Sequence, residues 1–158
     1  MMNKSRKACI RSLAAALGIV ALTSLPAVAD EYRDLVKTGK EAFQSQCLNC
    51  HKTVEEATAG YRTKSDWQKL VADMVVRGSK LDAGQQAAVV EYLIGRGLLM
   101  SQCRTCHAIQ RPLTANKSYD DWKSTVERMA QKMPPNLKLS PERIEKIAGF
   151  LAVERPLP

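Results

Sequence analysis

The chain has 158 residues, of which 45% are hydrophobic and 25% charged, and its formal net charge is +8. Four of its 24 Lys and Arg residues, and none of its 16 acidic ones, lie within residues 1–29, so the rest of the chain carries a net charge of only +4. This interleaved balance excludes a nucleic-acid-binding protein.

Residues 1–29 have the pattern of a secretory signal peptide. A basic start precedes an apolar run over 13–25, and a small-x-small cleavage sequence follows at 27–29. A transmembrane anchor is the alternative, but the run is shorter than the ~20 apolar residues that a bilayer requires. We therefore expect export to the periplasm, with the mature chain starting at Asp30 and Cys9 lost with the peptide.

The first helix of the mature chain is expected to lead directly into a short motif. Apolar residues recur at helical spacing from Leu35 to Cys47. The sequence Cys-Leu-Asn-Cys-His at 47–51 then returns as Cys-Arg-Thr-Cys-His at 103–107, and the two copies contain both histidines of the chain. The two copies also contain four of the five cysteines of the chain, and the fifth is Cys9.

Cys-x-x-Cys-His is the attachment pattern of c-type haem. Two thiols one helical turn apart can reach the two vinyl groups of a porphyrin, and the following histidine then lies below the iron. We therefore expect two covalently bound haem c groups. The expected attachment residues are Cys47, Cys50, Cys103 and Cys106, and the expected proximal iron ligands are His51 and His107.

Other uses of four cysteines agree less well with the sequence. Disulfides are common in exported proteins, but a bridge within one helical turn is strained and leaves both histidines unexplained. Zinc requires four ligands, whereas each half offers two thiols and one histidine. A thioredoxin-like redox pair requires a sheet, and no segment has the pattern of a strand.

Two more helices are expected after the first motif. Trp67, Val71 and Met74 form an apolar stripe at helical spacing that ends near Gly78. Asp82, with a glutamine three residues later, has the pattern of a capping box at the start of the last helix. We expect the segment between motif and stripe, residues 52–65, to be a loop.

The second half repeats this order. Its stripe runs through Trp122, Val126 and Met129 and ends before Pro134, because the residue before a proline is disfavoured in a helix. Ser140, followed by a proline, has the pattern of the start of the last helix. Residues 108–118 are the corresponding expected loop.

The halves, residues 30–96 and 97–158, therefore form an internal repeat of about 56 residues. The Asp-Trp pair at 66–67 matches the one at 121–122. We expect an all-α fold of two tandem domains. Domains of ~60 residues bury too little apolar surface to be stable alone, and a covalently bound haem in each would supply the missing core.

The second axial iron ligand is expected to be methionine, since no histidine remains. Met74 and Met129 are equivalent in the repeat, each seven residues after its tryptophan. A methionine in a helical stripe is commonly an ordinary core residue. Met133 is the rival in the second half, directly before a proline, but its counterpart in the first half is Gly78, which cannot ligate iron.

The order of these features resembles class I cytochromes c: Cys-x-x-Cys-His, Asp-Trp, Val-x-x-Met, then Tyr-Leu or Phe-Leu near the end of a helix. The tandem is similar to the dihaem N-terminal domain of the alpha subunit of quinohemoprotein amine dehydrogenases, over nearly the whole mature chain. In that family the distal ligand lies on the middle helix after the tryptophan, which favours Met74 and Met129. The further domains of that subunit have no counterpart here.

The resemblance implies two tandem cytochrome c-like haem domains that transfer electrons and perform no enzymatic reaction. We expect a periplasmic carrier between a dehydrogenase and a downstream acceptor, both redox proteins, with no nucleic-acid partner and no membrane segment after signal cleavage. The more basic second half is the expected contact for an acidic partner. The haem propionates are expected to pair with some of Arg62, Lys64, Arg111 and Lys117.

Two alternatives belong to other classes. The first is a dihaem enzyme of the peroxidase or thiosulfate-oxidising type, which requires one open haem site. The second is a haem subunit that anchors a larger dehydrogenase complex.

Overall fold

The computed structural model describes residues 25–58, 62–106 and 108–154. It is 74% helical, and none of these residues lies in a strand, which confirms the expected all-α class. Residues 1–24 of the expected signal peptide, and His107, lie outside the described part. No helix in the described ranges is both long and apolar enough to cross a bilayer.

The first half contributes three helices and the start of a fourth. They are α1 (Leu25–Ala42), continued by the π-helical turn η1 (Phe43–Cys47), α2 (Val54–Ala57), α3 (Lys64–Val76) and α4 (Ala83–Cys103). The second half adds α5 (Gln110–Thr114), α6 (Tyr119–Gln131), the 3-10 turn η2 (Pro135–Leu137) and α7 (Pro141–Val153). Short helices α2 and α5 lie in the segments expected to be loops, so that expectation was wrong in part.

The ends of the helices follow the local signals. Thr63 and Asp66 form a capping box at the start of α3, and the Ser118 hydroxyl accepts from the Asp121 amide at the equivalent start of α6. Gly78 has φ +111° directly after α3, a conformation that glycine adopts without steric cost. These signals confirm the predicted positions of the middle helices.

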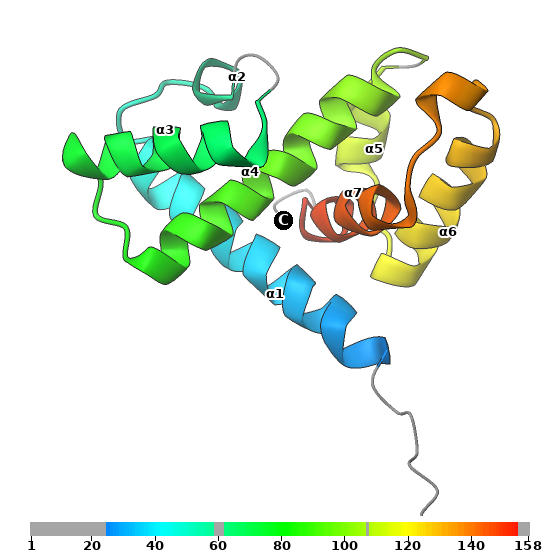
Figure 1. Ribbon diagram of the computed structural model, residues 1–158, viewed down its shortest axis with the longest axis horizontal. Helices are drawn as coiled ribbons and strands as arrows, with labels where there is room; N and C mark the ends of the chain where they lie inside the picture. Colours follow the sequence, from blue (N-terminus) through cyan, green and yellow to red (C-terminus); the bar gives the residue numbers. More distant parts are fainter. Residues whose placement is uncertain (1–24, 59–61, 107, 155–158) are drawn as a thin grey trace, which may run out of the picture.

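Helix α4 crosses the whole molecule (Figure 1). On one side lie α2 and α3, which with the end of α1 and the first part of α4 form the first lobe. On the other side α5, α6 and α7 form the second lobe with the last part of α4. The expected boundary between residues 96 and 97 therefore falls inside one continuous helix.

Glycines set the closest helix crossings, and two of these crossings repeat. A Cβ added at Gly39 of α1 would lie 3.0 Å from the Cβ of Tyr92, and one added at Gly95 would lie 2.7 Å from the Cβ of Phe150. The two glycines lie 56 residues apart and the two aromatic residues 58 apart, so both match in the repeat, and α1 crosses α4 as α4 crosses α7. The internal repeat of the sequence is thus also a repeat of helix packing.

One apolar cluster extends through both lobes. The rings of Phe43, Tyr92 and Phe150 follow each other with centroids 5.4 Å apart, and Val36 and Ile147 are fully buried in the same cluster. Helix α1 also packs on α7. The two halves consequently share their core, which removes part of the size problem that each would have alone.

Candidate cofactor-binding site

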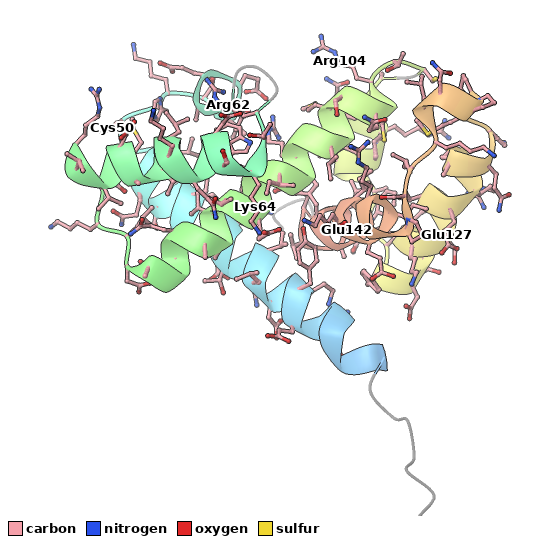
Figure 2. All side chains as sticks on the ribbon, in the orientation of Figure 1. Cys50, Arg62, Lys64, Arg104, Glu127 and Glu142 are labelled. Atoms are coloured by element: carbon pink, nitrogen blue, oxygen red, sulfur yellow. The ribbon has the colours of Figure 1, made fainter. Side chains whose placement is uncertain are left out.

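The first motif forms a tight turn at the end of η1. The amides of Cys50 and His51 both donate to the Cys47 carbonyl, at 3.2 and 2.9 Å. Cys47 and His51 are half-buried, and Cys50 is exposed. In Figure 2 the labelled Cys50 lies in the first lobe, as do Arg62 and Lys64 near the start of α3. The turn places two thiols and one imidazole on a single short segment.

The second motif has the same local geometry. The Cys106 amide donates a hydrogen bond to the Cys103 carbonyl at 3.4 Å, and the Thr105 hydroxyl donates to the Ser101 carbonyl. The first motif has the equivalent bond, from the side-chain amide of Asn49 to the carbonyl of residue 45. The predicted ligand His107 is outside the described residues, so its position stays a prediction.

All four motif cysteines are free thiols. Burial, and secondarily the neighbouring Cys50, raises the pKa of the Cys47 thiol; burial and Cys106 do the same to the pKa of Cys103. These thiols therefore stay protonated at neutral pH. Within the described ranges no three His, Cys, Asp or Glu side chains gather as a metal site.

A cavity of about 670 Å³ lies in the second lobe between the end of α4 and helix α6. Its size is within the range of pockets that enclose organic ligands. The cavity brings together four groups predicted from the sequence, and its lining includes Cys103, Cys106, Met129 and Met133. Both rival methionines are half-buried and line it, so the choice between them stays open.

The polar groups of this cavity indicate what its occupant must carry. Trp122 is buried, and its indole Nε1 has no hydrogen-bond partner among the described residues. A buried donor without an acceptor costs free energy, which an occupant with an acceptor would recover. Arg111 and Lys117 also line the cavity. A large apolar ring system with acidic substituents, such as haem, fits these thiols, thioethers, cations and the indole.

The first lobe repeats part of this arrangement. Trp67 is buried, and the Arg62 guanidinium lies 4.9 Å from its ring centroid, as the Lys117 ammonium lies 5.0 Å from the ring centroid of Trp122. Met74 is half-buried on α3. Cation, tryptophan and methionine therefore come in the same order in both lobes.

Lys64 was expected to pair with a haem propionate, but in the structure it pairs with a carboxylate of the protein itself. Its ammonium pairs with the buried carboxylate of Glu91 at 2.6 Å, and Lys146 of α7 lies 3.6 Å from the same carboxylate. An anionic partner is thus already present at Lys64, which weakens its candidacy for a haem propionate. Glu91 joins the two lobes instead.

Sequence reasoning missed the two buried charges of α4, Glu91 and Arg96. The Arg96 guanidinium donates to the Thr58 hydroxyl at 3.2 Å and to the Glu55 carboxylate at 3.1 Å, so it attaches α2 to α4. The only signal in the sequence was a charged residue within a largely apolar helix. Their partners are 27 to 55 positions away, where periodicity gives no information.

A second cavity of about 590 Å³ lies between the lobes. Its lining includes Glu55 of α2, together with Met100, Arg104 and Cys106 around the second motif. Cys106 lines both cavities, so the second thiol of the motif stands at the wall between them.

No protein-family model matches this sequence, and neither the curated proteins nor the solved structures contain a match to the chain.

Proposed function

We propose that this protein is a periplasmic c-type cytochrome that binds two haems and carries electrons between a dehydrogenase and a downstream acceptor. The observation that carries the proposal is the second-lobe cavity. Two motif thiols, a buried indole donor without a partner and two candidate thioether ligands line a single apolar space. The first motif, in an equivalent lobe, supports a second haem.

Each residue type has a defined role in this proposal. The motif thiols would hold the cofactor covalently, and the histidine after each pair would be an iron ligand. Bound haem supplies a one-electron couple. A thioether opposite an imidazole favours the reduced state and raises the reduction potential. The proposed ligand pairs are His51 with Met74 and His107 with Met129, with Met133 as the alternative to Met129.

The chain's own packing supports a role as an electron relay. Helix α4 belongs to both lobes, and its last residue is the first cysteine of the second motif. Gly39 and Gly95 let α1 and α7 pack closely against this one helix. The two motifs are therefore carried by one set of closely packed helices.

Mass spectrometry tests the proposal directly. Protein exported by a host that matures c-type cytochromes should be heavier than the polypeptide by two haems. The double variant Cys103→Ser, Cys106→Ser should carry one haem, and the matched variant Cys47→Ser, Cys50→Ser should also carry one. A bare polypeptide mass, from cells that mature a control cytochrome normally, would refute the proposal.

Carbon monoxide added to the reduced protein tests the electron-carrier role against the enzyme alternative. We expect no binding at either haem, because methionine occupies the sixth position. Stoichiometric binding at one haem would contradict the carrier role and favour a dihaem enzyme with one open site.

A further inference from the structure

Four cations surround the cavity of the second lobe. Arg111 and Lys117 come from the segment before α6, and Arg128 and Lys132 come from the end of α6. We call these four residues the basic rim. No acidic residue of the described chain lines this cavity. Glu127, labelled in Figure 2, lies on α6 but is not part of the lining.

Most of the basic rim has no anionic partner within the protein. Arg111, Arg128 and Lys132 are exposed, and none of them forms an ion pair with a described residue. Elsewhere in the second lobe Lys123 pairs with Glu145 at 2.6 Å, and Lys146 pairs with Glu142 at 3.3 Å. The basic rim therefore contains four of the seven Lys and Arg residues that form no ion pair within the described part of the second half.

The equivalent helix of the first lobe carries less positive charge at its end. Arg128 corresponds in the repeat to Asp73 of α3, whereas Lys132 corresponds to Arg77, which is also basic, so the two helix ends differ in charge at one of these two positions. Residues 30–96 contain ten basic and ten acidic side chains, whereas residues 97–158 contain ten and six. Cations at the end of a helix stabilise its dipole. That effect leaves the charges of Arg128 and Lys132 exposed to a partner, whereas Arg111 and Lys117, which precede α6, are the expected partners of the haem propionates.

We propose that the basic rim is the docking surface for an acidic redox protein, so that the second lobe, and not the first, exchanges electrons with that partner. This inference rests on the proposed function. Positive charge around the mouth of a cofactor cavity raises the rate of encounter with an acidic partner and orients it there. The chain outside residues 1–29 carries a net charge of only +4, with acidic residues interleaved, which favours a protein partner over the phosphate backbone of a nucleic acid.

The experiment maps an acidic probe on the reduced, haem-loaded protein. Poly-L-glutamate is added to ¹⁵N-labelled protein at low ionic strength, and the amide chemical shifts are followed. We expect the largest shifts near the basic rim and smaller ones along α3. Binding should weaken as ionic strength rises to about 0.15 M, where the screening length falls to ~8 Å.

Two pairs of substitutions make the test specific. Arg128→Gln with Lys132→Gln should weaken binding about fivefold, the effect of two exposed ion pairs. The matched pair Lys69→Gln with Arg77→Gln removes the same charge from α3 and its C-cap and should weaken it less than about twofold. Equal losses in both pairs, or shifts centred on α3, would overturn the proposal.

A single-stranded thymidine oligonucleotide of equal charge serves as the competing probe. Tighter binding of the oligonucleotide than of poly-L-glutamate at the basic rim would also overturn the proposal, in favour of a nucleic-acid surface. The haem content of the same samples, measured by mass spectrometry, distinguishes a failure of the docking proposal from a failure of the proposed function. Two bound haems with the wrong map refute only the docking surface, and no bound haem refutes the proposed function.

Discussion

At the scale of single residues, Met129 and Met133 offer two thioethers to one cavity. We expect Met129→Ala to remove about half of the sulfur-to-iron absorption band of the oxidised holoprotein, since one of two such bonds is lost. Met133→Ala is the matched control and should keep the whole band. Loss of the band in the Met133 variant alone would assign the ligand to Met133.

Glu145 gives a prediction about pH. A hydrogen bond from Lys123 at 2.6 Å, and one from the Tyr119 hydroxyl at 3.0 Å, lower the pKa of its carboxyl below the ordinary 4.5. Burial, and secondarily the same carboxylate, raises the pKa of Tyr119 to about 12. A depressed carboxyl pKa stabilises the fold above pH 4.5, and this contribution disappears as the pH falls through the lower folded value.

We therefore expect Glu145→Gln to lower the free energy of unfolding at pH ~7 by less than ~1 kcal/mol, because the ion pair is partly exposed. As the pH falls through the lowered pKa of the Glu145 carboxyl, the difference between the variant and the parent protein should disappear. Urea unfolding as a function of pH measures both quantities. A difference of the same size at every pH would show that the carboxylate charge is not the cause.

The residues of the site differ in whether a local sequence pattern can predict them. The attachment roles of the motif cysteines, and the ligand roles of the histidines after them, follow from the fixed spacing of the motif and stay predictions. Met74 and Met129 followed from the repeat and stay predictions. The Lys64–Glu91 pair and the position of Arg96 were not predictable, because each depends on how two distant segments pack.

At the scale of elements, two glycines of α4 should respond in opposite directions to alanine. A Cβ at Gly95 would lie 2.7 Å from the Cβ of Phe150, so Gly95→Ala should force α4 and α7 apart and cost about 1–3 kcal/mol. A Cβ at Gly97 meets nothing within 4 Å, so Gly97→Ala should stabilise the helix by about 0.5–1 kcal/mol. Thermal unfolding of the two holoprotein variants measures both effects.

If both substitutions destabilised the protein alike, the close crossing of α4 and α7 would not be a feature of the fold in solution.

The elements were predictable where caps and periodicity agreed. Asp82 begins α4 with the expected capping box, and Ser140 begins α7. The helices α2 and α5 were missed because four or five residues are too few to show a period. Helix α2 is marked by local bonds, such as the one from the Glu56 amide to the Thr53 hydroxyl, and by the distant ion pair of Glu55 with Arg96.

At the scale of the whole molecule, the shared core predicts that the lobes unfold together. The chain has two tryptophans, Trp67 in the first lobe and Trp122 in the second. In the variants Trp67→Phe and Trp122→Phe, the fluorescence of the remaining tryptophan reports on one lobe. Far-UV circular dichroism reports on all helices. Within each variant we expect both signals to change at the same urea concentration. Separated midpoints would show two independent domains.

Helix α4 belongs to both lobes, and this bears on how further lobes could be added to such a fold. The 21 residues of α4 close one lobe and open the next, whereas the 13 residues of α7 only close one. A longer α7 that ended in another Cys-x-x-Cys-His would open a third lobe without disturbing the first two. The architecture is therefore one of repeated lobes, in which the helix that completes one lobe can also carry the motif of the next.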